Sequence, residues 1–178
     1  MNKPVELLCH DETRTPAFTR LLVRIGRAQG ALRVTYRVPW NVAELLLPQQ
    51  VEPRRADGLW QRTCFEIFIR VGDGPEYLEC NFSPSGEWAS YLFEDYRKGM
   101  TEARLEPTKM VASANHVRFE LSTLLYLPDV ADVPWTVNIA AVLEEKSGRK
   151  SYWALAHPPG PPDFHHPDGF MLQLPPTS

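Results

Sequence analysis

Two glutamates on predicted neighbouring strands are the side chains of this sequence best suited to chemistry. Glu66 lies in the run TCFEIFIRV, where period-two alternation places it on one side with Cys64 and Phe68. An ionised carboxylate among such groups needs partners. Glu79 lies in the next run, EYLECNF. In a suitable register the two carboxyls would face each other and share a proton or hold a cation, for which calcium is a candidate.

Two other interpretations of this pair stay open. The strand face that carries Glu66 can instead be exposed to solvent, with Glu66 paired to Arg70 or Arg118 in a purely structural role. Two separated carboxylates also serve in glycoside hydrolysis, where their spacing decides the reaction. The alternation alone does not separate these cases.

Aromatic side chains form a second candidate group, and the sequence contains five tryptophans: Trp40, Trp60, Trp88, Trp135 and Trp153. Flat rings stack on the C–H patches of sugars, while carboxylates, amides and guanidinium groups bind the hydroxyls. Trp88 and Trp135 start predicted strands, which is typical of packing residues. Trp60 follows RADGL outside a strand, and Trp153 alternates with an inward-pointing Tyr152. We therefore expect Trp60 and Trp153 to form an exposed platform.

A histidine-containing loop near the end of the chain holds a third group, namely His157, Asp163, His165 and His166. Adjacent histidines rarely bind one ion, and the spacing matches no standard zinc pattern. Asp163, His165 and His166 are therefore weak metal candidates, and the alternative is a proline-stiffened loop whose polar groups satisfy one another. His157 ends a predicted strand four residues after Trp153, which favours a hydrogen-bond donor that faces a ligand.

Several familiar catalytic signatures are missing from the sequence. It contains no GxGxxG, GxxxxGK[ST], GxSxG or HExxH pattern, so dinucleotide-binding, P-loop, serine-hydrolase and zincin functions lose their usual support. Ser83 and Ser85 flank Pro84 in a predicted turn, which indicates a structural role. A non-enzymatic function is therefore favoured.

The composition limits the class of protein. The chain has 178 residues and a net charge of -3, which favours one domain over residues 1–178 and no nucleic-acid partner. No apolar stretch approaches the roughly 20 residues of a membrane helix, and no secretion signal is evident. Three scattered cysteines do not make a disulfide framework. We expect a cytoplasmic protein without a membrane partner.

The elements that must position these residues are strands. Seventeen prolines against 10 glycines disfavour long helices, and alternating apolar residues predict strands over 23–38, with a turn at GRAQGA, and over 63–71. EYLECNF and EWASYLF continue the latter as a three-strand antiparallel meander. Further strands are predicted at the following places: 108–113, 116–121, 135–145, 149–156 and GFMLQL. LSTLLYLPD is interpreted as a short helix or loop. About ten short strands predict an all-β sandwich or barrel with proline-rich loops.

The stretch LWQRTCFEIFIRVGDGPEYLECNFSPSGEWASYLFEDYRKGM, followed by AVLEEKSGRKSYWALAHPPGPPDFHHPDGF, resembles the DOMON-like family related to family 9 carbohydrate-binding modules. The likeness covers most of the chain. It implies an immunoglobulin-like antiparallel β-sandwich that binds a small ligand, sugar or haem, without performing chemistry on it.

The same resemblance implies where the ligand would lie. In the sugar-binding relatives, aromatic platforms and a carboxylate from the strand that corresponds to FEIFI line the site, which falls on Trp60, Glu66 and Trp153. The haem-binding relatives use a methionine and a histidine, for which Met100 or Met110 with His157 are the nearest residues.

The sequence therefore predicts a non-catalytic module for a saccharide or a related small molecule. Trp60 and Trp153 would stack on the ligand, Glu66 and Glu79 would accept hydrogen bonds from its hydroxyls, and Arg97 or His157 would donate them, so the predicted ligand-binding set is Trp60, Glu66, Glu79, Arg97, Trp153 and His157. The alternatives are a haem electron carrier, a glycoside hydrolase that uses the two glutamates, and an interaction domain. The sequence does not fix the oligomeric state.

Overall fold

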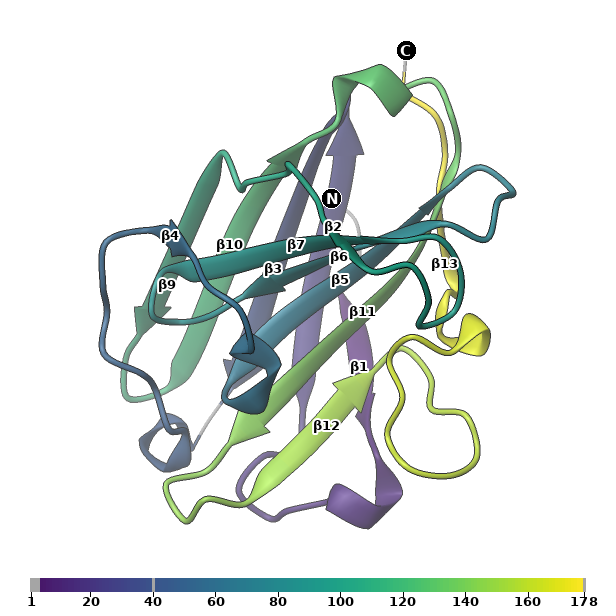
Figure 1. Ribbon diagram of the computed structural model, residues 1–178. Coiled ribbons are helices and arrows are strands. Elements are labelled where there is room, and N and C mark those ends of the chain that lie inside the picture. Colours follow the sequence, from purple (N-terminus) through teal and green to yellow (C-terminus); the bar gives the residue numbers. More distant parts are fainter. Residues whose placement is uncertain (1–3, 40, 178) are drawn as a thin grey trace.

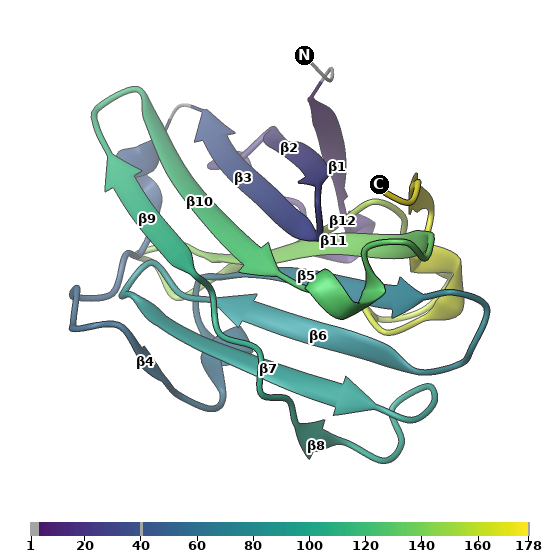
Figure 2. The same ribbon diagram turned by 90° about the horizontal axis from the view of Figure 1, so that it is seen from above.

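The strands of the protein form one continuous sheet that curls into two facing layers (Figures 1 and 2). The structure, a computed structural model, describes residues 4–39 and 41–177, so Trp40 lies outside the described residues. The strands are β1 Val5–Cys9, β2 Leu21–Ala28, β3 Ala31–Pro39, β4 Arg54–Arg55, β5 Cys64–Val71, β6 Tyr77–Phe82, β7 Glu87–Phe93, β8 Thr101–Glu102, β9 Lys109–Ala114, β10 Arg118–Tyr126, β11 Trp135–Glu144, β12 Lys150–Ala154 and β13 Leu172–Leu174. Short 3-10 turns connect them: η1 Asp11–Thr13, η2 Val42–Glu44, η3 Leu59–Gln61, η4 Pro128–Val130 and η5 Pro167–Gly169.

The sheet order explains how one sheet makes two layers. The order is β4-β7-β6-β5-β11-β12-β1-β2-β3-β10-β9, with β13 beside β11 and β8 beside β7. Strand β1 belongs to both layers, because Val5–Leu7 pair with β2 whereas Leu8 and Cys9 pair with β12. Figure 2 shows the strands of one layer crossing those of the other. A single strand therefore carries the sheet from one layer to the next.

Strand β5 lies at the centre of the packing and is buried on both faces. Toward the other layer it contributes Phe65, Ile67 and Ile69 to the main core. There the ring of Phe65 stacks on Phe119 of β10 at 5.4 Å between centroids. On its other face Cys64 and Phe68 join a second apolar cluster, which includes residues of η3 and of the loop after β12. This second face, covered by the chain itself, holds the site described below.

Most predicted strands are confirmed, and the all-β class with them. The meander β5–β6–β7 is antiparallel throughout, and residues 29–30 turn the β2–β3 hairpin with positive φ at Gln29 and Gly30. The sheet is mixed, because β4 pairs with β7 in parallel. The immunoglobulin-like topology stays a prediction.

The prediction of a short helix or loop over LSTLLYLPD is wrong, and strand β1 has no counterpart among the predicted strands. LSTLLYLPD is neither helix nor loop over most of its length, because Leu121–Tyr126 continue β10 and bury Leu121, Thr123 and Leu125 at period two. Strand β1 was not predicted, because its short run VELLC buries only Leu7 fully.

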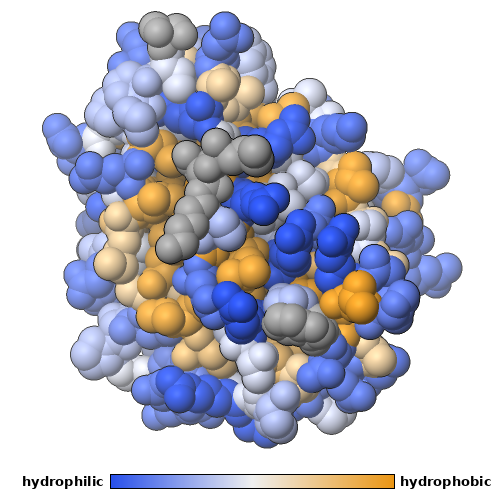
Figure 3. Space-filling view, turned by 180° about the vertical axis from the view of Figure 1, so that it is seen from behind, coloured by the Kyte–Doolittle hydropathy of each residue, from blue (hydrophilic) through white to orange (hydrophobic). Residues whose placement is uncertain are grey.

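The face of the molecule opposite the one in Figure 1 is largely polar. Seen from behind, it presents mostly hydrophilic residues with apolar residues in separate small patches (Figure 3). On the outer face of β3 and β10, for example, Arg37 pairs with Glu120 at 2.7 Å. Within residues 4–39 and 41–177, no helix has the length and apolar character needed to cross a membrane.

Arg27, near the end of β2, fastens two separate segments to the sheet. Its guanidinium donates to five backbone carbonyls, those of Val130, Ala131, Val133, Leu174 and Pro175. It also lies 3.5 Å from the ring centroid of Trp135. The carbonyls before β11 and after β13 are thereby satisfied by one side chain.

We expect Arg27→Lys to lower the free energy of unfolding by about 1–3 kcal/mol, because an ammonium cannot reproduce the planar fork of donors. Chemical denaturation measures this. Arg24→Lys, at an exposed position of the same strand, is the matched control and should change stability by less than about 0.5 kcal/mol. Equal effects of the two substitutions would contradict the role assigned to Arg27.

Candidate ligand-binding site

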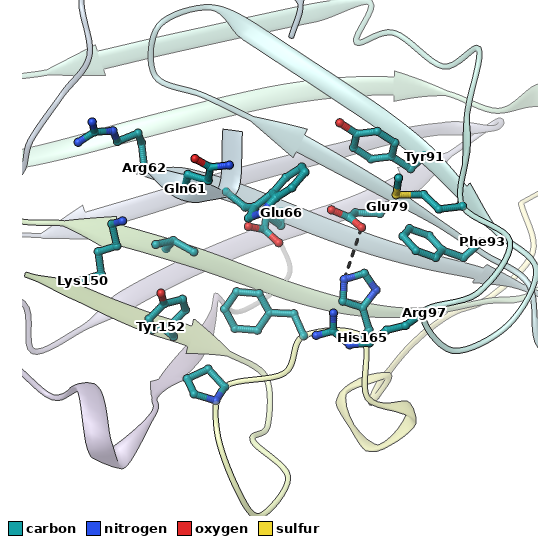
Figure 4. A pocket seen from close by; sticks show the side chains of 15 residues that line it. Gln61, Arg62, Glu66, Glu79, Tyr91, Phe93, Arg97, Lys150, Tyr152 and His165 are labelled. Atoms are coloured by element: carbon teal, nitrogen blue, oxygen red, sulfur yellow. Dashed lines mark ion pairs between the residues drawn. The ribbon is translucent and has the colours of Figure 1, made fainter. Parts of the chain in front are cut away.

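A pocket of about 880 Å³ opens on the outer face of β5, β6 and β7 (Figure 4). It is lined by fifteen residues: Trp60, Gln61, Arg62, Glu66, Glu79, Tyr91, Phe93, Arg97, Met100, Val142, Lys150, Tyr152, Pro162, Phe164 and His165. In Figure 4 the side chains of Gln61, Arg62 and Lys150 lie toward one end, those of Arg97, Phe93 and His165 toward the other, and Glu66 lies between. The volume is in the range of small-molecule sites.

Glu66 lies on the floor of this pocket, and one of its carboxyl oxygens has no hydrogen-bond partner among the described residues. The residue is only 3% exposed, and its Oε1 is buried with no hydrogen bond among the described residues. Neighbouring positions on β11 and β5 carry Ala140, Cys64 and Phe68, which offer no strong donor. An unpaired carboxyl in such surroundings favours its neutral form.

Glu79 lies diagonally across from Glu66 on β6 and is better supported. The amide of Asn81 donates to Glu79 Oε1 at 2.7 Å. The Nε2 atom of His165 lies 3.6 Å from Glu79 Oε2, as the dashed line in Figure 4 marks. Because Asn81 is the register partner of Glu66 and Phe68 that of Glu79, the two carboxyls share one face at the diagonal spacing of adjacent strands.

Tyr77 contacts the imidazole of His165 on the side away from Glu79. The backbone N–H of Arg97 donates to the Tyr77 hydroxyl at 3.2 Å, and that hydroxyl lies 2.9 Å from Nδ1 of His165. In the tautomer whose Nδ1 accepts from this hydroxyl, the neutral imidazole carries its proton on Nε2, facing Glu79.

Arg97 and Asp163 close the same end of the pocket. The guanidinium of Arg97 donates to Asp163 Oδ1 at 2.7 Å, and that oxygen also accepts from the backbone N–H of His165 at 3.0 Å. The Tyr96 hydroxyl donates to Asp163 Oδ2. Arg97 has a φ of 55°, which turns the loop after β7 over the pocket. These contacts anchor the loop that carries His165.

Trp60 forms an aromatic rim at the pocket mouth. It lies in η3, which begins after Gly58 at a φ of 74°, a conformation that favours glycine. The Trp60 side chain is 42% exposed and meets Tyr91 edge-to-face at 6.2 Å between centroids. Tyr91 is held in turn by a hydrogen bond from its hydroxyl to Asp57 at 2.5 Å.

The pocket shifts the titration of its ionisable groups. Burial raises the pKa of the Glu66 carboxyl well above its usual value, and the nearby Glu79 raises it further. Burial raises the pKa of Glu79 to about 6, against the opposing effects of Asn81 and Arg97. Burial lowers the pKa of His165 to about 4, and Arg97 adds to this. Burial therefore shifts all three groups toward their neutral forms.

The structure brings four of the six predicted binding residues together. Trp60, Glu66, Glu79 and Arg97 all line the pocket. The solvent-exposed strand face considered for Glu66 is wrong, because Glu66 is buried and pairs with neither arginine.

The expectation of an exposed Trp153 is wrong. Trp153 is 2% exposed, packs in the core between the layers and donates from Nε1 to Ser151 at 2.9 Å. Its neighbour Tyr152 lines the pocket instead. The alternation along β12 was predicted, but which of the two residues faces the core was inverted.

His157 lies away from the pocket. It borders a separate hollow beside β1, where its Nε2 donates to the carbonyl of Leu8 at 2.9 Å and its ring meets His10 edge-to-face at 5.0 Å. Its role there is to tie the loop after β12 to β1. The methionine–histidine pairs considered as haem ligands are also apart. Met100 borders the pocket and Met110 packs against the core, whereas His157 borders the separate hollow.

The three residues considered as metal ligands, Asp163, His165 and His166, instead make hydrogen bonds that hold their own loop in place. Asp163 and His165 belong to the network around Arg97, and His166 accepts from the backbone N–H of Asp168 to begin η5. In the part of the chain that the structure describes, no group of three or more histidine, cysteine, aspartate or glutamate side chains could hold a metal ion. The residues present do not fit calcium or haem.

Sequence reasoning missed several pocket residues: Gln61, Arg62, Tyr91, Phe93, Lys150, Tyr152, Phe164 and, as part of this site, His165. For Tyr91 a signal existed, since EWASYLF pairs with EYLECNF in the predicted meander and places it opposite Glu79. Phe164 and His165 come from an irregular loop, for which periodicity offers no guide.

Comparison with known proteins shows the fold. No protein-family model matches this sequence, and no curated protein matches it. A solved structure from Bacteroides uniformis, described as a candidate carbohydrate-binding protein, covers 94% of this chain and 83% of its own at a TM-score of 0.69 and 14% identity. The two chains share an architecture.

Two solved structures of a family 9 carbohydrate-binding module from Caldicellulosiruptor kristjanssonii are more distant. One holds cellotriose and the other glucose, and each aligns at a TM-score of 0.48 and 11% identity over 79% of this chain. The alignments cover 67% and 69% of those chains.

We expect the double variant Glu66→Gln/Glu79→Gln to be more stable than the wild type at high pH. Because both folded-state pKa values lie above the usual 4.5, the folded protein holds more protons, and its unfolding free energy falls as pH rises through 4.5. By about pH 8 the unfolding free energy of the variant should exceed that of the wild type by on the order of 2 kcal/mol.

Denaturation at a series of pH values, comparing the variant with the wild type at each, makes this test. The comparison with the wild type is needed because the lowered pKa of His165 makes the unfolding free energy rise with pH, which is opposite to the effect of the two glutamates. Glu120→Gln on the outer face of β10 is the control and should show no such growth with pH. A difference that stays constant from about pH 4 to pH 8 would contradict the burial of two poorly supported carboxyls.

Proposed function

We propose that the protein binds a carbohydrate-type ligand in the pocket over Glu66 and Glu79 and does not act on it chemically. The observation that carries this proposal is the combination in one cavity of an exposed indole, Trp60, with two buried carboxyls beneath it. A sugar ring offers an apolar face and a set of hydroxyls, and it needs both kinds of surface at once.

The polar groups of the pocket suit hydroxyl recognition. Gln61, Arg62 and Lys150 lie at one end and Arg97 at the other, as Figure 4 shows, so donors flank the acceptors of the floor. Neutral carboxyls both donate and accept hydrogen bonds. The shared fold of the Bacteroides uniformis protein supports the same class of ligand.

The proposed ligand geometry departs from the sequence prediction in one respect. Trp60 is the stacking ring at the pocket mouth, while Tyr152 and Phe164, whose rings lie 6.1 Å apart, supply the opposite wall. Glu66 and Glu79 accept from or donate to the hydroxyls, and Arg97 donates where its pairing with Asp163 allows.

We expect isothermal titration with a panel of mono- and disaccharides to detect binding, and Trp60→Ala to weaken it by about 5- to 150-fold, since one stacked aromatic contributes about 1–3 kcal/mol. Tyr126→Ala removes another exposed aromatic side chain, on β10 in the other layer, and is the matched control with unchanged affinity.

Absence of heat with every sugar, or equal affinity in Trp60→Ala, would overturn the proposal. Chromogenic glycosides separate binding from hydrolysis. Release of the chromophore that disappears in Glu66→Gln and Glu79→Gln would assign the pocket to an enzyme instead.

A further inference from the structure

Two neighbouring side chains, one of them on the floor of the pocket, contain hydrogen-bond acceptors that lack donors. Oε1 of Glu66 and Oδ1 of Asn81 are both buried without a partner in the described part of the chain. The two residues are register partners on β5 and β6, and the amide nitrogen of Asn81 is already committed to Glu79 at 2.7 Å. Buried acceptors left unpaired cost free energy. Of the two residues Glu66 lines the pocket and Asn81 does not, so a ligand that donates to the Glu66 carboxyl recovers part of that cost.

The cations around the pocket are engaged elsewhere or form no pair with the floor. Arg62 pairs with Glu144 at 3.0 Å and Arg97 with Asp163 at 2.7 Å. Among the described residues no arginine or lysine forms an ion pair with Glu66, and Glu79 has only the neutral His165 at 3.6 Å. An ionised carboxyl on this floor therefore has no arginine or lysine paired with it among the described residues, and a cationic group of a ligand can supply that partner.

A protonated primary amine matches both features. A hydroxyl donates one hydrogen bond, whereas an ammonium group donates three and carries the charge that stabilises a carboxylate. The aromatic side chains that line the same cavity, such as Tyr91, Phe93 and Phe164, are favourable neighbours for a cation. A single sugar hydroxyl in the same position supplies neither the additional donors nor the charge.

We propose that the ligand carries a protonated amine that binds against Glu66 and Glu79, so that amino sugars are preferred over neutral sugars. This rests on the function proposed above and specifies its ligand class. The ammonium group donates to the carboxyl of Glu66, and the sugar ring extends toward Trp60 at the mouth.

The proposal includes a defined movement of one proton. In the free pocket Glu66 holds a proton; when the amine binds, Glu66 ionises, the amine keeps its charge, and the proton passes to the solvent. The titratable and charged groups that line the pocket with Glu66 are the following: Arg62 beyond η3, Glu79 on β6, Tyr91 on β7, Arg97 after β7, Lys150 and Tyr152 on β12, and His165 in the loop. Cys64 is buried on the same face of β5, whereas Tyr36 and Cys80 belong to the core on the other face of the sheet. Of the pocket groups, Glu79 shares the site proposed for the amine.

Isothermal titration with glucosamine, N-acetylglucosamine and glucose at about pH 6.5 tests this. We expect glucosamine to bind at least about tenfold more tightly than the two neutral sugars, since a charged hydrogen bond to a buried carboxylate is worth more than a neutral one. Titrations in two buffers of different ionisation enthalpy should show proton release, up to about one per ligand, for glucosamine alone.

Variants locate the effect. Glu66→Gln should reduce glucosamine affinity by about tenfold or more and glucose affinity by less than about threefold. Glu120→Gln should change neither. Thermal melting shows whether each variant is folded. The proton-release measurement uses the wild type alone, so it does not depend on the folding of any variant.

The outcomes separate this inference from the function on which it rests. Equal or tighter binding of glucose, absence of proton release, or full glucosamine affinity in folded Glu66→Gln would overturn the amine preference and leave sugar binding in place. Absence of binding by all three sugars would overturn both. Binding of glucosamine and of ethanolamine with equal affinity would support the amine contact and contradict the sugar.

Discussion

The burial of two carboxyls on a sheet face that the chain itself covers is the constraint on which the site depends. A sheet face usually either buries apolar side chains or is exposed to water. The outer face of β5 and β6 is instead buried in large part and carries two carboxyls. The loop after β12 and η3 close over its ends and leave a cavity above Glu66 and Glu79. Both carboxyls are almost completely buried. The groups in contact with Glu79, namely Asn81 and His165, therefore affect whether this carboxyl holds a proton.

The covering loops act as a framework for this cavity. Asp163 binds Arg97 across the pocket end, and Tyr77 links Arg97 to His165 through two hydrogen bonds. On the far side of β12, His157 and His10 fasten the same loop to β1. Since polar contacts hold both ends of the loop, the pocket has the defined shape that selective binding needs.

Alternation along the chain predicts the strands but not which face meets the core. The meander β5–β6–β7 follows from residues 63–93, and with it the shared face of Glu66 and Glu79. The same reasoning inverts Trp153 and Tyr152, because both are large aromatics and either fits a core. The loop contacts of Asp163 and His165 join residues that lie far apart in the sequence, so no local pattern reveals them.

Carbon-13 NMR of the glutamate side-chain carboxyls during a sugar titration tests the central claim most directly. If the ligand binds over the buried pair, the resonances of Glu66 and Glu79 shift with added sugar, while those of Glu6 and Glu120, which pair with arginines on the outside of the other layer, stay fixed. Shifts confined to the outer glutamates, with Glu66 and Glu79 unchanged at saturation, would contradict this account.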